Sequence, residues 1–260
     1  MVAPSVFLGG LVGVALSGGF VYWEVGRFAT PQVPETRFDE RKEVAAYTVG
    51  LFVGVPLAVA FLLFLASMAN GALPGALVSL GLLVAGTELA QRAILRTRYW
   101  GSGLSGPFYA IGFRAAVGGV LALTIVASIP GDFASVTAVV VLSTAFESLA
   151  VVALEVAGAL VSLRLLGSRF GSGGGPWRGA LLGAVGFFLL GLSPLGGAVA
   201  TVVGPVLVLL VAGYTYYRFR PLLSEIPAPA STTPPLREAP ALYGRTPPGS
   251  SDRPLTRNER

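Results

Sequence analysis

Seven long apolar runs dominate the chain and limit what it can fold into. They cover residues 5–23, 44–68, 73–95, 107–129, 134–163, 178–193 and 195–217. About 20 apolar residues in a helix are enough to cross the hydrocarbon core of a bilayer, which is about 30 Å thick. Charged residues make up only 12% of the chain, against about 25% in a typical soluble protein. The sequence therefore predicts an all-α polytopic bundle of about seven transmembrane helices.

Basic residues lie at alternate connections between the runs. They follow the first, third, fifth and seventh runs or flank those connections: Arg27, Arg37, Arg41, Lys42, Arg92, Arg96, Arg98, Arg164, Arg169, Arg178, Arg218 and Arg220. The other connections, ANGA, PGDF and SPLGG, carry no basic residue. Because basic residues accumulate on the cytoplasmic side of membrane proteins, we expect the N-terminus outside and the C-terminus in the cytoplasm. An odd number of spans requires the same arrangement.

The last two runs leave a second arrangement open. Their connection is built around SPLGG, residues 193–197, and the sixth run is the shortest of the seven. Such a pair can form two complete spans or one hairpin that enters and leaves the same face of the membrane. We expect two complete spans, because seven spans agree with the charge distribution.

The positions of the basic residues also interpret the net charge of +5. Basic residues beside membrane-spanning helices are attracted to the anionic membrane surface. We therefore expect the lipid bilayer as a partner and no nucleic acid. The expected location is the cell membrane, as a multi-pass protein, and the abundance of Arg, Ala, Gly and Val suits a prokaryotic, GC-rich genome.

The first basic loop, residues 24–43, has the densest charge in the chain. Thr36, followed by Asp39 and Glu40, resembles a capping box that starts a helix with acidic groups in its first turn. One interpretation is a solvated helix start. The other is a surface that binds a protein partner through charged residues, namely Arg37, Asp39, Glu40, Arg41 and Lys42.

The tail, residues 221–260, differs in kind from the rest of the chain. It is rich in Pro, Ser and Thr and has almost no apolar residues to bury. We expect it to be disordered in the cytoplasm. It is either an inert tail or a second segment that binds a membrane or cytoplasmic protein.

The absence of two residue types excludes several kinds of chemistry. The chain has no Cys and no His, which excludes disulfides, thiolate nucleophiles and ordinary zinc sites. We expect no cofactor and no metal. Rhomboid-type and HExxH proteolysis also need His, and aspartyl intramembrane proteolysis needs two Asp within spans. An enzyme would have to rely on carboxylate, Arg, Ser or Tyr chemistry, and we do not expect one.

Two further families are excluded by single residues. A retinal Schiff base needs a lysine in the last helix, but Lys42 is the only lysine. The segment TELAQR, residues 87–92, is partly similar to the ExxxR element of membrane-bound CAAX-type proteases. That family also uses intramembrane His, so no role is carried over to this chain.

Five charged residues interrupt the apolar runs and are the candidate site. They are Glu88, Arg92, Arg114, Glu147 and Glu155. A charge at the bilayer centre costs about 2.5–3.5 kcal/mol on insertion scales, and such groups usually face the protein interior and pair. With a rise of about 1.5 Å per residue, Glu88, Glu147 and Arg114 fall at one level, while Arg92 and Glu155 lie nearer the cytoplasm. We therefore expect Arg114 to approach Glu88 or Glu147.

The intramembrane charges permit two interpretations. They are either static ion pairs that fix the register of the helices, or groups that line a polar site for a proton, an ion or a small solute. Three carboxylates against two arginines leave one glutamate to be protonated, which favours the second. The expected function is a small transport-type protein. The alternative is a non-catalytic scaffold or accessory subunit of a membrane complex.

Overall fold

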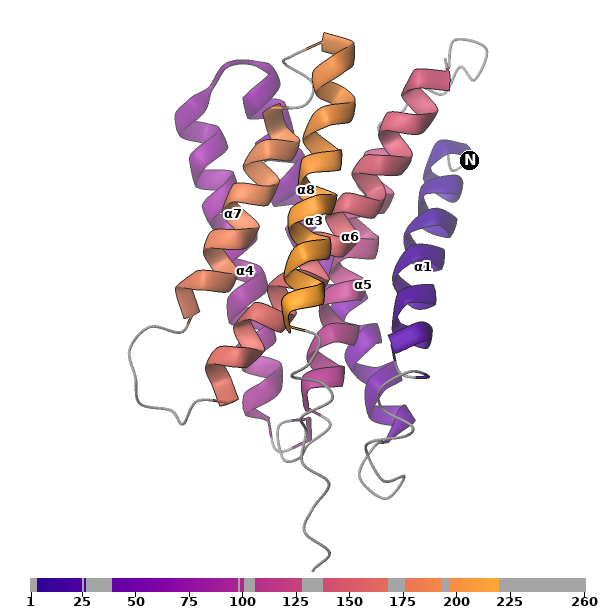
Figure 1. Ribbon diagram of the computed structural model, residues 1–260, viewed down its shortest axis with the longest axis vertical. Coiled ribbons are helices and arrows are strands. Elements are labelled where there is room, and N and C mark those ends of the chain that lie inside the picture. The colour runs from indigo at the N-terminus through magenta and orange to yellow at the C-terminus, as the bar shows by residue number, and fades with distance from the viewer. Residues whose placement is uncertain are drawn as a thin grey trace, which may run out of the picture. The chain divides into compact units, whose positions relative to one another are not determined.

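The computed structural model describes residues 4–24, 26, 39–97, 99–100, 106–127, 138–167, 176–192 and 197–219. These residues form seven α-helices (Figure 1): α1 (Pro4–Glu24), α3 (Glu40–Ala69), α4 (Leu73–Arg96), α5 (Gly106–Ala127), α6 (Ala138–Gly167), α7 (Pro176–Leu192) and α8 (Gly197–Phe219). No strand is present among the described residues, so the prediction of an all-α chain is confirmed. Five of the helices, α3, α4, α5, α6 and α8, are long and apolar enough to cross a membrane.

The observed helices match the seven apolar runs, and the largest differences, of four residues, lie at the start of α3 and at both ends of α6. Helix α3 begins at Glu40, and its N-cap is Asp39 and not Thr36. The Asp39 carboxylate accepts a hydrogen bond from the backbone N–H of Arg41 at 2.9 Å, which satisfies one of the free donors of the first turn. Helix α6 begins at Ala138, four residues later than the run that predicted it. Residues 220–260, including the predicted tail, lie outside the described residues.

Successive helices alternate in direction, so the bundle has two distinct ends. In Figure 1 the chain runs down α1, up α3, down α4, up α5, down α6, up α7 and down α8. The start of α3, the end of α4, the start of α7 and the end of α8 therefore lie at one end. Exposed basic side chains lie there, from Arg41, Arg96, Arg178 and Arg218. We call this the basic end of the bundle.

Helix α5 is the central helix. It packs against α1, α3, α4 and α6. In the apolar stretch of 18 residues that characterises each helix, 83% of α5 is buried inside the bundle. The corresponding share is 33% for α3 and 22% for α8. Most side chains on α5 are therefore enclosed by protein, and Arg114 is among them.

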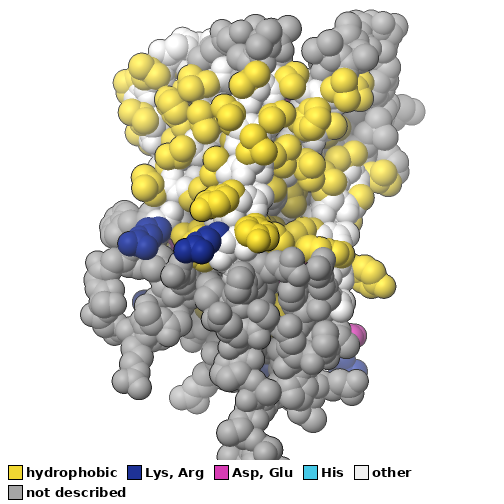
Figure 2. Space-filling view, in the orientation of Figure 1, with side chains coloured by type: hydrophobic (Ala, Val, Ile, Leu, Met, Phe, Trp, Pro, Cys, Tyr) yellow, Lys and Arg dark blue, Asp and Glu magenta, His cyan; other side chains and the backbone are white. Residues whose placement is uncertain are grey.

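The outer surface of the bundle is apolar. Exposed large hydrophobic side chains occur on α1, α3, α4, α7 and α8, such as Leu11, Phe52, Leu63, Leu77, Leu82, Leu89, Leu181, Leu207 and Leu210. Figure 2 shows hydrophobic side chains over the upper part of one face and Lys or Arg side chains at its lower edge. A continuous apolar surface of this kind is compatible with lipid contact and a multi-pass membrane protein.

Glycines let α1 and α3 approach α5 closely. A Cβ on Gly13 of α1 would overlap the carbonyl of Gly119 on α5, and a Cβ on Gly50 of α3 would overlap the carbonyl of Phe113. Small residues at such crossings allow backbones to pack where lipid provides no hydrophobic driving force. A hydrogen bond also links α1 to α3, because the hydroxyl oxygens of Ser17 and Tyr47 lie 2.7 Å apart.

We expect Gly13→Ala to lower the free energy of unfolding by about 1–3 kcal/mol, because the added methyl overpacks the contact between α1 and α5. Gly19 is the matched control on the same helix, since a Cβ there meets nothing within 4 Å. Gly19→Ala should be neutral or should stabilise by up to about 1 kcal/mol, because alanine favours helix. Unfolding in mixed detergent micelles, followed by circular dichroism, measures both. Equal effects at the two positions would contradict the close approach.

Candidate functional site

Arg114 lies at the middle of the bundle and donates hydrogen bonds to three side chains. Its Nε donates to Oε1 of Gln91 at 2.5 Å, and its Nη1 donates to Oε2 of Glu155 at 2.7 Å. Its Nη2 pairs with Oε1 of Glu88. Only 5% of Arg114 is exposed, so the guanidinium is held by protein groups and not by bulk water.

Three helices supply these groups because of simple spacings in the sequence. Glu88 and Gln91 are three residues apart on α4, and Glu155 and Ser162 are seven apart on α6, so each pair shares a helix face. The hydroxyl of Ser162 donates to the Glu88 carboxylate, at 3.0 Å from Oε1 and 3.1 Å from Oε2. We call the five buried residues the Arg114 cluster: Glu88, Gln91, Arg114, Glu155 and Ser162.

Glycines make room for the cluster. A Cβ on Gly179 of α7 would overlap Oγ of Ser162 and lie 2.8 Å from Oε1 of Glu88. On α6, a Cβ at Gly158 would lie 3.6 Å from Nη1 of Arg114. Helix α7 therefore closes the cluster with a backbone surface and contributes no side chain at that point.

We expect Gly179→Ala to destabilise the bundle by about 1–3 kcal/mol, because the methyl group displaces Ser162 or Glu88. Gly183 lies one helical turn further along α7, and a Cβ there meets the side chain of Val84 at 3.6 Å, an ordinary contact. Gly183→Ala is thus the control and should change stability little. Thermal unfolding of the two purified variants compares them, and a harmless Gly179→Ala would show that α7 does not close the cluster.

The charges of the cluster do not cancel. Two carboxylates, Glu88 and Glu155, face one guanidinium, which leaves one negative charge in excess when both are ionised. Two buried polar atoms of the cluster, Oε1 of Glu155 and Nε2 of Gln91, make no hydrogen bond with any residue that the structure describes. A buried charge is costly unless it is paired or neutralised. The cluster therefore holds one more carboxyl than its guanidinium can balance.

The prediction that Arg114 approaches Glu88 or Glu147 is confirmed for Glu88. The assignment of Glu155 to a lower level with Arg92 is wrong, because Glu155 pairs directly with Arg114. Arg92 is half-buried on α4, and it forms no ion pair within the described part of the chain. Glu147 precedes Glu155 by eight residues, about 12 Å along α6, and is not among the groups to which Arg114 donates.

The later start of α6 explains the error in level. Measured from Ala138, Glu155 lies about 26 Å along its helix, against about 31 Å from the start that the sequence predicted. Glu88 lies about 22 Å from the start of α4 at Leu73. The remaining difference between the depths of Glu155 and Glu88 is about 4 Å, which a long arginine side chain can span.

Gln91 and Ser162 were missed by the sequence analysis because neither is charged. Both carried a detectable signal. Gln91 lies on the face of α4 that holds Glu88, and Ser162 lies two helical turns beyond Glu155 on the same face of α6. A search for any polar side chain on these two faces, charged or not, finds both.

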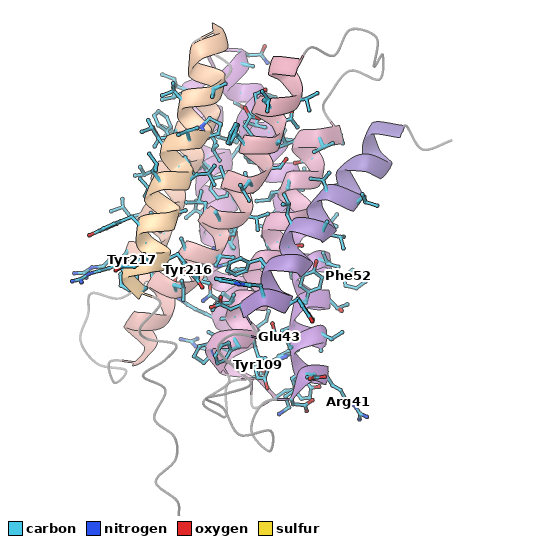
Figure 3. All side chains as sticks on the ribbon, turned by 45° about the vertical axis from the view of Figure 1, so that its right-hand side comes forward. Arg41, Glu43, Phe52, Tyr109, Tyr216 and Tyr217 are labelled. Carbon is cyan, nitrogen blue, oxygen red and sulfur yellow. The ribbon has the colours of Figure 1, made fainter. Side chains whose placement is uncertain are left out.

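Several residues of the first basic loop are engaged within the protein. The backbone N–H of Asp39 donates to the hydroxyl of Tyr109 at 3.1 Å, and the indole of Trp100 donates to the carbonyl of Lys42 at 2.9 Å. The Lys42 ammonium lies over the ring of Tyr99, 5.1 Å from its centroid. Glu40 and Arg41 are exposed, and Figure 3 shows Arg41 at the lower edge of the bundle. Arg37 lies outside the described residues.

Two more carboxyls are buried near the basic end, and the sequence analysis did not single them out. Glu43 is 6% exposed and its carboxyl packs on Gly112 of α5, where a Cβ would overlap it. Glu24, the last residue of α1, accepts a hydrogen bond from the hydroxyl of Tyr216 at 2.8 Å. Figure 3 shows Glu43, Tyr109 and Tyr216 in the lower half of the bundle. These carboxyls are the first and last residues of loop 24–43 and lie just outside the predicted apolar runs.

Comparison of the chain with protein-family models, with curated proteins and with solved structures finds no match. The site therefore has to be interpreted from its own geometry. Among the described residues, no group of three or more His, Cys, Asp or Glu side chains could hold a metal ion.

Proposed function

We propose that this chain is a small transport-type protein of a prokaryotic cell membrane, with the Arg114 cluster as the site of a proton, an ion or a small solute. All seven helices cross the membrane in this proposal, including the shorter apolar helices α1 and α7. The N-terminus is outside and the basic end is cytoplasmic, because basic residues accumulate on that side. Loop 24–43 and tail 221–260 are the segments that would bind a protein partner.

The observation that carries the proposal is the sharing of one guanidinium by two buried carboxylates. A charge-balanced clasp would need only one glutamate beside Arg114. The second carboxylate adds a charge that must be neutralised inside an apolar bundle. A group that gains and loses a positive charge in this environment is what a transport site requires.

A scaffold or accessory subunit is the second candidate, and the burial of the cluster favours it. Each of the five side chains is at least nine-tenths buried, so the cluster is closed to both ends in this conformation. A static clasp that holds α4, α5 and α6 in register would look the same. In that case activity would reside in the exposed residues of the first basic loop and in the tail.

Proton flux into vesicles separates the two candidates. The full-length protein is reconstituted into liposomes that contain a pH-sensitive dye, and a pH gradient is imposed with a counter-ion pathway present. The assay is run without a second substrate and then with an added solute or salt. A transport protein should collapse the gradient faster than protein-free vesicles in at least one of these conditions. A well-folded protein that matches empty vesicles under every condition would favour the scaffold.

We expect the two ends of α3 to lie on opposite sides of the membrane. The chain has no cysteine, so single cysteines at exposed Glu40 and Asn70 report each end without background. Asn70→Cys should react with an impermeant maleimide in intact cells, whereas Glu40→Cys should react only after permeabilisation. The reverse pattern would place the basic end outside and contradict the proposed orientation.

A further inference from the structure

We propose that the ion bound by the Arg114 cluster is a proton, and that Oε1 of Glu155 carries it. The role of this proton in transport rests on the transport-type function proposed above. The location of the proton follows from the hydrogen bonds of the cluster alone. Glu88 and Glu155 together have four carboxylate oxygens.

Three of these four oxygens already accept hydrogen bonds. Oε1 of Glu88 accepts from Arg114 and Ser162, Oε2 of Glu88 accepts from Ser162, and Oε2 of Glu155 accepts from Arg114. Both oxygens of Glu88 are therefore already engaged. Oε1 of Glu155 is buried and accepts none from the described residues. It is therefore the oxygen at which a proton displaces no existing bond.

The other ligand classes fit less well. A hard metal ion takes about six to eight oxygen ligands, but the cluster has one unengaged oxygen, and the guanidinium of Arg114 would repel a cation beside it. An anionic solute would add to the excess of negative charge. A proton supplies the single missing positive charge and needs only one oxygen.

The charged groups that face Glu155 are Arg114 of α5 and Glu88 of α4. On the other helices that pack against α6, the described charged side chains are Glu24, Arg178 and Arg218, at the ends of α1, α7 and α8. Protonation of Glu155 thus leaves a balanced pair of Arg114 and Glu88. When the O–H bond of Glu155 breaks, the proton passes to water and the carboxylate stays paired with Nη1 of Arg114.

The proton exchanges with the basic end in this proposal, because that end is the nearer one. Arg114 lies about 12 Å along α5 from its start at Gly106 and about 20 Å from its end at Ala127. Glu88 is likewise about 12 Å from Arg96, the last residue of α4.

Infrared difference spectroscopy of the full-length protein in liposomes tests the assignment. A protonated carboxyl has a C=O stretch that a carboxylate lacks. Spectra of the wild type, Glu155→Asp and Glu88→Asp, two changes that keep the charges of the cluster, are compared at neutral pH, where exposed carboxyls with pKa values near 4 are ionised. Bands from Glu24 and Glu43 are common to the three proteins and cancel in the differences. The proposal expects Glu155→Asp to shift one protonated-carboxyl band and Glu88→Asp to leave it in place.

A larger shift in Glu88→Asp, or a shift in neither variant, would overturn the assignment. Should Glu155→Asp fail to fold, Ser162→Ala replaces it. This change removes hydrogen bonds from Glu88 alone, so the band should stay in place, and a shifted band would put the proton on Glu88. Proton flux in the same vesicles separates the two proposals. Flux with the band on Glu88 leaves transport standing and removes the assignment to Glu155. A band on Glu155 without flux retains the assignment and removes transport.

Discussion

Replacing Arg114 with leucine should lower the free energy of unfolding by about 3–5 kcal/mol, the usual cost of breaking a buried ion pair by removing one partner. The variant leaves two carboxylates, Glu88 and Glu155, in the centre of the bundle without their shared cation. It also leaves Oε1 of Gln91 without its donor. Reversible unfolding in mixed detergent micelles measures the loss.

Arg92→Leu is the control for that experiment. Arg92 is a half-buried arginine on α4 with no ion pair among the described residues. We expect its replacement to change the free energy of unfolding by less than about 1 kcal/mol. If Arg92→Leu lowered the free energy of unfolding as much as Arg114→Leu, both arginines would neutralise buried carboxylates, as the levels predicted from the sequence imply.

The second large effect is a recovery of stability without a recovery of function. The triple variant Arg114→Leu, Glu88→Gln, Glu155→Gln removes the charges together and keeps the shape of the two glutamate side chains. Replacing a buried ion pair as a whole is often neutral or stabilising, so the triple variant should regain most of the stability that Arg114→Leu loses. Its proton flux should nevertheless equal that of protein-free vesicles, because it has no group in the cluster that can bind a proton.

Two other results would argue against the account. A triple variant as unstable as Arg114→Leu would show that the arginine acts through its packing and not through its charge. A triple variant that is stable and still carries flux would show that the cluster is only a clasp. The same unfolding and flux assays read both outcomes.

The helices could be predicted from the sequence because lipid imposes a local rule. A span needs about 20 apolar residues, and each of the seven runs satisfies or approaches that length within a single stretch of chain. The pairing of Arg114 with Glu88 could also be predicted, because an arginine at that depth needs a partner and Glu88 lies at its level.

The remaining contacts of the cluster depend on how helices are placed against one another. Glu155 was assigned to the wrong level because a start error of four residues shifts a group by about 6 Å along a helix. The central position of α5 could not be predicted from its own sequence, since its apolar residues resemble those of the outer helices. The closure by Gly179 depends on a contact between α7 and α6 that no spacing within either helix specifies.

Proton flux of Glu155→Gln tests whether Glu155 carries the transported proton. The variant is reconstituted beside the wild type and beside Glu40→Gln, which removes an exposed carboxylate of α3 outside the cluster. Glutamine at position 155 can still accept the hydrogen bond from Nη1 of Arg114, so the bundle should form. At matched incorporation, the account predicts flux in the wild type and in Glu40→Gln, and flux at the level of protein-free vesicles in Glu155→Gln. A folded Glu155→Gln protein that carries protons at the wild-type rate would contradict it.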